Sequence, residues 1–160
     1  MSEIIARLEA EARDLQFAAF DETVALNLGQ ALLRRAVAAD LPVVINIRSA
    51  SRCYFHAALP GSAPLNDLWV QRKSNTALRF HEASFLVGQR HLTNGESLTK
   101  HGLDNAQHAD HGGAVPIRVK GVGVVAVATV SGLPQAEDHD LVIAAMREVL
   151  GLMAIEQKKD

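Results

Sequence analysis

The chain has 160 residues, of which 48% are hydrophobic and 21% are charged, which suits one globular domain. Its formal net charge of −2 gives no electrostatic basis for binding nucleic acid, which needs a clustered basic surface. No apolar run reaches the ~18 residues of a membrane-spanning helix, and the single cysteine excludes an internal disulfide framework. We therefore expect one cytoplasmic domain over residues 1–160, without a targeting segment and without a membrane or nucleic-acid partner.

The N-terminal quarter predicts two helices separated by a short strand. Ser2 can cap the first helix, whose apolar residues recur every three or four positions. Residues 16–20 form the short strand. Asp21 caps the second helix, which ends before Pro42 because the residue before a proline avoids helical backbone angles.

An antiparallel hairpin is predicted next, from strands at 43–47 and 53–59. A three-residue loop at 49–51 would place Arg48 opposite Arg52. Two facing arginines repel each other, so an anion or a carboxylate would lie between them. The alternative is a different loop length, which would change the register.

The remaining elements are three helices, a second hairpin and a last helix. They cover 66–82, 85–92, 96–101, 115–119 with 124–130, and the segment from 137 onward. The glycine pair at 112–113 introduces the second hairpin, and acidic residues suit the positive end of the last helix. Two hairpins flanked by helices predict an α/β (α+β) fold with helices packed on an antiparallel sheet.

Several motifs have an ordinary structural explanation. Residues 121–126 match the pattern GxGxxA, but they continue into a strand and not into the helix that a dinucleotide needs. The crowded His101, His108, Asp110 and His111 fit no standard zinc spacing, so no metal site is predicted. Asp138-His139-Asp140 would need a nucleophile such as Ser131 to be catalytic, and helix capping accounts for its two acids. Cys53, on a strand, is expected to be a small core residue.

One helix has a basic side made by Arg72, Lys73 and Arg79. A solvated face or ion pairs between subunits would account for it. The alternative is a site for an anionic ligand. Trp69 and Phe80 on the same helix are expected in the core.

Two stretches resemble a known family. The first contains Phe55, the turn Pro60-Gly61-Ser62 and the element Trp69-x-x-Arg72-Lys73, and the second contains Gly112-Gly113-x-x-Pro116-Ile117, Val130-Ser131-Gly132 and Asp138-His139. Together they resemble the small intracellular, functionally uncharacterised branch of the haem-degrading domain family, also called GlcG/HbpS-like. The resemblance covers almost the whole chain. It implies a profilin-like three-layer fold, with a five-stranded antiparallel sheet flanked by helices, and assembly into homo-oligomers.

The resemblance also implies, more weakly, binding of haem or a related tetrapyrrole. Candidate axial ligands are His56, His81 and His111, and candidate partners for propionates or another anionic small molecule are Arg48, Arg72, Lys73 and Arg79. Gly112 and Gly113 are expected to adjoin any ligand site, because glycine lets the backbone approach closely. Haem would be non-covalent, since the chain has no Cys-x-x-Cys-His.

Two other functions stay open. One is a small-molecule enzyme using histidine and aspartate residues near the glycine turns, and the other is a non-catalytic oligomeric interaction protein. A non-catalytic role is favoured, because no substrate class is indicated by the residues.

Overall fold

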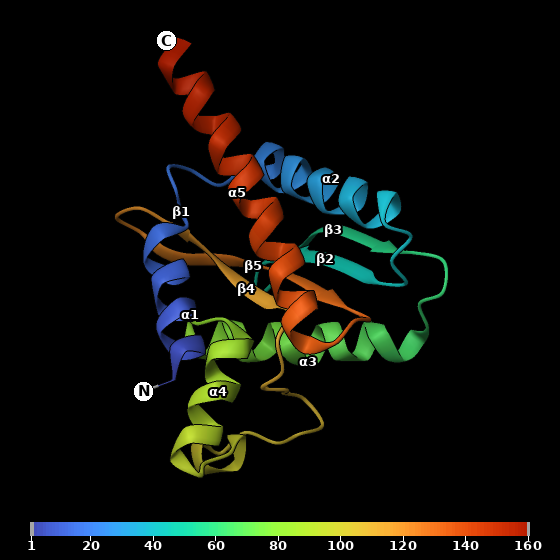
Figure 1. Ribbon diagram of the computed structural model, residues 1–160, viewed down its shortest axis with the longest axis vertical. Coiled ribbons are helices and arrows are strands. Elements are labelled where there is room, and N and C mark those ends of the chain that lie inside the picture. Colours follow the sequence, from blue (N-terminus) through green and yellow to red (C-terminus); the bar gives the residue numbers. More distant parts are fainter. Residues whose placement is uncertain (1, 160) are drawn as a thin grey trace.

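Five strands form a single mixed sheet in the computed structural model, which describes residues 2–159 (Figure 1). The strands are β1 (Gln16–Phe17), β2 (Val44–Arg48), β3 (Cys53–Ala58), β4 (Ala114–Val119) and β5 (Gly123–Ser131), in the spatial order β1-β4-β5-β2-β3. Both predicted hairpins are present and antiparallel. The expectation of a wholly antiparallel sheet is wrong in one place, because β1 pairs with β4 in parallel. No tight turn joins these two strands, so none dictates that they run in opposite directions.

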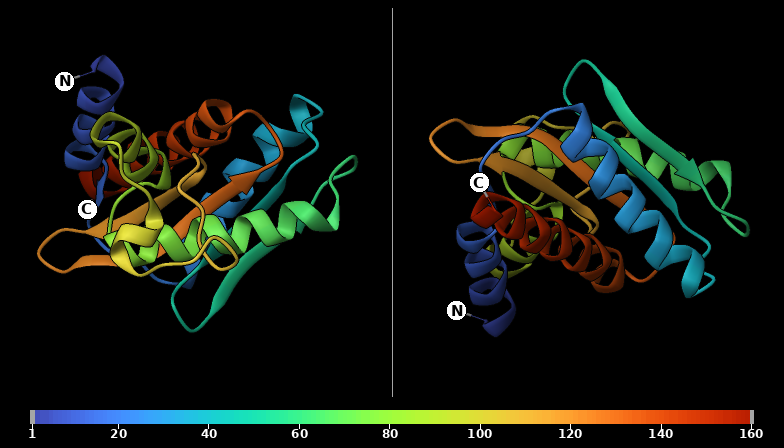
Figure 2. Two further views of the ribbon diagram at one scale, coloured as in Figure 1. Left: turned by 90° about the horizontal axis from the view of Figure 1, so that it is seen from below. Right: turned by 90° about the horizontal axis from the view of Figure 1, so that it is seen from above.

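Helices cover both faces of the sheet and give the predicted three layers. The helices α2 (Glu22–Ala38) and α5 (Gln135–Lys159) pack on one face, and α3 (Pro64–Phe80) packs on the other, as the two views in Figure 2 show. Beside this body, α1 (Glu3–Asp14) packs against α4 (Ser84–Asn94), and a 3-10 helix, η1 (Leu98–His101), follows α4. No helix among residues 2–159 is long and apolar enough to cross a membrane.

Helix α2 shows how local sequence produces this packing. Asp21 caps it as predicted, because its side-chain oxygen accepts a hydrogen bond from the Val24 N–H at 2.9 Å. Leu28, Leu32 and Ala36 lie on the face toward the sheet and are fully buried. Most of the core therefore lies between the sheet and the α2/α5 layer.

The first hairpin has a different register from the expected one. Arg48 pairs with Cys53 across a β-bulge, and Arg52 belongs to the loop, where its carbonyl accepts the Ser49 N–H at 2.8 Å. The predicted facing arginines are wrong because the loop is longer than three residues. Arg52 instead pairs with Glu22 at 3.3 Å, so no anion is needed between Arg48 and Arg52.

Cys53 is exposed, and its expected place in the core is wrong. It lies at the start of β3, the edge strand of the sheet, where fewer elements cover the side chains. The segment 121–126 forms the turn between β4 and β5 and the beginning of β5, which confirms the hairpin interpretation of its glycines.

Candidate functional site

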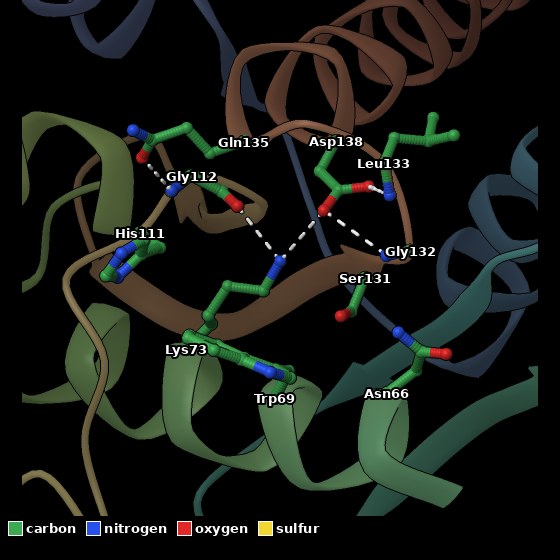
Figure 3. A pocket seen from close by; sticks show the side chains of 10 residues that line it. All are labelled: Asn66, Trp69, Lys73, His111, Gly112, Ser131, Gly132, Leu133, Gln135 and Asp138. Atoms are coloured by element: carbon green, nitrogen blue, oxygen red, sulfur yellow. Dashed lines mark hydrogen bonds and ion pairs between the residues drawn. The ribbon is translucent and has the colours of Figure 1, made fainter. Parts of the chain in front are cut away.

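A cavity of about 260 Å³ lies between α3 and the start of α5, and we call it the α3–α5 pocket (Figure 3). Four parts of the chain form its wall: the first half of α3, the segment before β4, the end of β5 with the turn that follows it, and the start of α5. Its lining residues are Asn66, Trp69, Lys73, His111, Gly112, Ser131, Gly132, Leu133, Gln135 and Asp138.

A buried ion pair forms the floor of this pocket. The Lys73 ammonium lies 3.1 Å from an Asp138 carboxylate oxygen, and both side chains are about 3% exposed. Lys73 also donates to the carbonyls of Gly112, at 2.9 Å, and Val130, at 2.7 Å. Asp138 in turn accepts the Leu133 N–H at 3.0 Å. All three Lys73 donors are therefore used within the protein, which makes the pair a clamp between α3, the segment before β4 and α5.

Burial dominates the electrostatics of this pair. Loss of hydration raises the pKa of Asp138 and lowers the pKa of Lys73, and the attraction between the two groups opposes both shifts. The charges cancel each other inside the protein. Any ligand in the pocket therefore meets a neutral floor and not a free ammonium group.

The predicted glycine pair makes this close packing geometrically feasible. Gly113 has φ +138°, and a Cβ atom there would lie 2.4 Å from Lys73 Nζ and 2.4 Å from the Val130 carbonyl oxygen. At Gly112 a Cβ atom would lie 2.4 Å from the Gln135 carbonyl oxygen. The backbone at 112–113 thus approaches Lys73 and α5 more closely than any side chain would allow.

Several hydrogen-bond donors of the pocket have no acceptor in its wall. In Figure 3, no hydrogen bond joins Ser131, Trp69 or Asn66 to the other lining residues. The Asn66 carbonyl oxygen accepts the Ala63 N–H at 2.9 Å, which leaves its amide N–H groups free. The Gln135 side chain is arranged likewise, because its oxygen accepts the Gly112 N–H at 2.9 Å. The pocket therefore presents mainly donors to whatever enters it.

Trp69 and His111 form the aromatic side of the pocket, whereas the neighbouring Arg72 lines a different cavity. The His111 ring contacts Trp69 edge-on, with centroids 5.2 Å apart, and is half exposed. The Arg72 guanidinium lies 4.5 Å from the Trp69 ring centroid and donates to the Asn105 carbonyl at 2.7 Å. Trp69 is half-buried, so it packs partly as the core residue that we expected and partly as pocket wall.

The structure separates the predicted site residues into groups. Lys73, His111 and Gly112 meet in the α3–α5 pocket with Gly113 directly behind. Arg48 and Arg79 line a different cavity of about 510 Å³. His56 is held between Asn46 and Asp67, at 3.0 Å from each, and His81 is the residue that follows α3. The predicted basic side of α3 is not one face, because Lys73 is buried and points toward Asp138 and the Gly112 and Val130 carbonyls.

The acids at the start of α5 do not form a relay. Asp138 faces Lys73, His139 is buried and pairs with Glu11 at 2.9 Å, and Asp140 pairs with Arg7 at 3.4 Å. Ser131 lines the pocket, whereas His139 does not. The three neighbours thus serve three different contacts, and His139 is not placed to activate Ser131.

Sequence reasoning missed Asp138, Ser131, Asn66 and Gln135 as pocket residues. The position of Lys73 on α3 could have indicated a buried acidic partner. Lys73 lies on the same side of α3 as the buried Val70 and Ala77, at helical spacing. A lysine on an apolar stripe needs a buried acid, because an unpaired buried charge is unstable.

Comparisons with known proteins agree with this architecture. A family model described as haem degrading protein HbpS-like matches residues 20–147. A UPF0303 protein of Streptomyces coelicolor is 45% identical over 148 residues, which cover 92% of this chain and 94% of the relative.

Solved structures show the same fold. The crystal structure of the Ybr137w protein superposes with a TM-score of 0.86 at 30% identity, over 96% of this chain and 91% of that chain. The PduOC:heme complex superposes with a TM-score of 0.65 at 21% identity, over 79% of this chain and 94% of that chain. The matched family model spans most of the strands, the α3–α5 pocket and its buried ion pair. This chain therefore belongs to the HbpS-like haem-degrading protein family.

Proposed function

We propose that this protein binds a small molecule through a carboxylate group held in the α3–α5 pocket. The observation that carries the proposal is the set of free donors from Ser131, Trp69, Asn66 and Gln135 around a floor whose own charges are already paired. Donors without acceptors in a cavity favour a ligand that brings acceptors. A carboxylate brings two oxygens and accepts several hydrogen bonds at once.

The size of the pocket limits the ligand. Sites for drug-sized molecules are usually about 300–1,000 Å³, and this cavity is about 260 Å³. A small organic acid fits inside. A tetrapyrrole does not fit as a whole, so only an edge carrying a propionate could enter.

Haem is the second candidate, because a protein of the same fold is described as a heme complex and the family name refers to haem. His111 lines the pocket and is exposed enough to be an axial ligand, and Arg72, outside the pocket, contacts the Trp69 ring. A small organic acid and haem would both place a carboxylate in the pocket. They differ in the part of the ligand that lies outside it.

The first test is titration of the purified protein with short-chain mono- and dicarboxylates, followed by calorimetry. Saturable binding is expected for at least one acid. Ser131→Ala and Asn66→Ala should each weaken it about 10–100-fold, because a hydrogen bond to a charged group contributes about 1.5–3 kcal/mol. Gln71→Ala, on an exposed position of α3, is the matched control. Equal losses in all three variants, or no saturable binding, would contradict the carboxylate proposal.

The haem arm uses absorbance. Hemin bound at a defined site should give a sharpened Soret band that saturates at one haem per site. His111→Ala should abolish the sharpening because it removes the axial ligand, and Arg72→Ala should weaken affinity because it removes a partner for a propionate. A broad, non-saturating signal that neither substitution changes would mean that hemin merely adheres to apolar surface.

We also infer that the protein assembles into homo-oligomers. The end of α5 projects beyond the rest of the fold (Figure 1), and it carries the exposed Leu152 and Ile155. Exposed apolar side chains on a projecting helix are typical of surfaces that a partner covers.

Light scattering should give a multiple of the 17.2 kDa chain mass. Leu152→Glu with Ile155→Glu should reduce that mass, whereas Val122→Glu, on the exposed β4–β5 turn, should not. A mass of one chain for the unaltered protein would refute the inference.

A further inference from the structure

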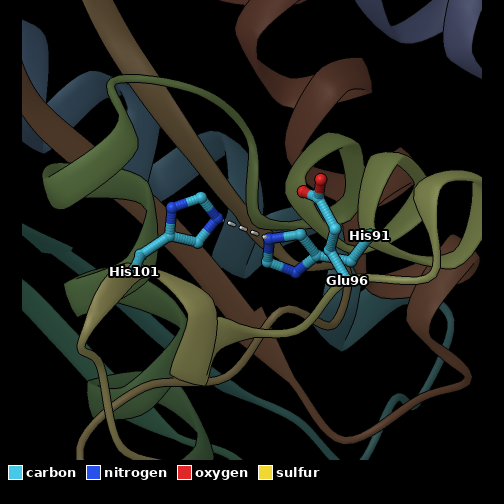
Figure 4. Close-up of side chains that lie close together, drawn as sticks. All are labelled: His91, Glu96 and His101. Atoms are coloured by element: carbon cyan, nitrogen blue, oxygen red, sulfur yellow. Dashed lines mark hydrogen bonds between the residues drawn. The ribbon is translucent and has the colours of Figure 1, made fainter.

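Two histidines and a glutamate, none of which lines the α3–α5 pocket, meet at the end of α4. His91 lies in the last turns of α4, Glu96 follows the turn after that helix, and His101 ends η1. One ligand atom from each lies within 4.8 Å of the other two. Figure 4 shows the two imidazole rings with their nitrogens directed at each other and the Glu96 carboxylate beside them.

The separation of the two imidazole nitrogens is the first argument for a metal. His91 Nε2 and His101 Nε2 are 3.2 Å apart. With Zn–N bonds of about 2.0–2.1 Å, two nitrogens at a tetrahedral angle lie about 3.3–3.4 Å apart. The two rings thus already have nearly the spacing that one shared ion requires.

A hydrogen bond on the other side of His91 also favours a metal ion. Its Nδ1 lies 2.8 Å from an Asp110 carboxylate oxygen. A carboxylate only accepts, so Nδ1 holds the proton and Nε2 keeps its lone pair, which points toward His101. A carboxylate that orients a histidine in this way is the usual support of a zinc ligand.

Glu96 and the groups around the two histidines also favour a cation. One oxygen of Glu96 pairs with Lys100, and the second oxygen makes no hydrogen bond or ion pair among residues 2–159. Phe80 contacts both histidine rings edge-on, with centroids 6.1 Å from His91 and 5.1 Å from His101, which fixes their orientation. Two carboxylates and one ammonium surround the histidines, so the site has an excess of negative charge for a divalent cation.

From these contacts we propose that His91, Glu96 and His101 bind a divalent transition-metal ion, with Asp110 orienting His91. Imidazole and carboxylate ligands favour Zn²⁺. Two histidines and a glutamate leave the fourth tetrahedral position open. His91 and Glu96 also line a cavity of about 120 Å³, through which water can reach the site. The proposal differs from the sequence-based expectation of no metal. None of the three ligands lines the α3–α5 pocket, although His111 and Gln135 line both cavities.

The alternative is a plain hydrogen bond in which His101 Nε2–H donates to His91 Nε2. That bond, together with the ion pair between Lys100 and Glu96, accounts for the same contacts without a metal ion. The two arrangements predict different behaviour toward added metal, which makes them separable by experiment.

The test titrates the full chain, without an affinity tag and freed of metal by chelator, with Zn²⁺ by calorimetry and with Co²⁺ by visible absorption. One equivalent should bind, and Co²⁺ should give the intense bands of a tetrahedral ion. His101→Ala and Glu96→Gln alter side chains at the surface, so the fold should persist while stoichiometric binding is lost or strongly reduced. Asp110→Asn should weaken binding about 10–100-fold, because it alters the group that orients a ligand.

His56→Ala is the matched control, because His56 also pairs with a carboxylate, Asp67 at 3.0 Å, and lies outside the cluster. It should leave the titration unchanged. Zn²⁺ should raise the melting temperature of the unaltered protein and not that of His101→Ala. Absence of one-equivalent binding, or binding that His101→Ala and His56→Ala affect equally, would overturn the proposal and leave only the histidine hydrogen bond.

Discussion

Replacing Lys73 with methionine is expected to lower the free energy of unfolding by about 3–5 kcal/mol, because it leaves the buried Asp138 carboxylate without its cation. Methionine is close to lysine in length and keeps the apolar part of the side chain. The loss therefore reports the missing charge and its hydrogen bonds to the Gly112 and Val130 carbonyls. Urea unfolding followed by circular dichroism measures it.

A second substitution separates the charge from the packing. Asp138→Asn keeps a side-chain oxygen for the Leu133 N–H and removes the negative charge. The double variant Lys73→Met/Asp138→Asn should therefore be more stable than Lys73→Met alone, although it carries one more change. A double variant as unstable as the sum of the two single changes would show that the ion pair does not couple the two residues.

The pH dependence should have a defined sign. Burial raises the pKa of Asp138, so the folded protein holds that proton more tightly than the unfolded chain. The contribution of Asp138 to stability is therefore present at low pH. It is lost as the pH rises from the ordinary pKa of 3.8 through the higher pKa of Asp138 in the folded protein. In Lys73→Met the carboxylate has lost its cation, so the stability deficit relative to the unaltered protein should shrink as the pH falls toward 3.8. A deficit independent of pH would contradict an ionised, buried Asp138.

Much of the fold follows from neighbouring residues and could be predicted. The cap at Asp21, the stripe on α2 and the β4–β5 turn each depend on residues a few positions apart. The predicted β2–β3 register was wrong. The bulge at Arg48 and the additional loop residue depend on packing and not on a local sequence pattern. The parallel pairing of β1 was not predicted for a similar reason, since its partner β4 is remote in sequence.

The sites were harder to predict because their partners are far apart in the chain. Lys73 meets Asp138 across 65 positions, and no spacing rule links them. The histidine-rich segment could be recognised in the sequence, but its histidines contact different parts of the fold. His101 contacts His91 of α4, and His111 contacts Trp69 of α3. The glycine pair at 112–113 was the most informative local signal, because close backbone approach requires it wherever the partners come from.

Gly113→Ala tests that close approach, and we expect a loss of about 3–5 kcal/mol in the free energy of unfolding. Alanine at φ +138° is strained, and its Cβ would lie 2.4 Å from both Lys73 Nζ and the Val130 carbonyl oxygen. The carbonyl belongs to β5 and cannot move without disturbing the sheet. Gly121→Ala is the matched control, because φ there is +75° and nothing lies within 4 Å of the added methyl group. It should cost only the backbone strain, about 1–2 kcal/mol. If urea unfolding gives equal losses for the two variants, the contact with Lys73 and β5 is not what requires glycine at this position.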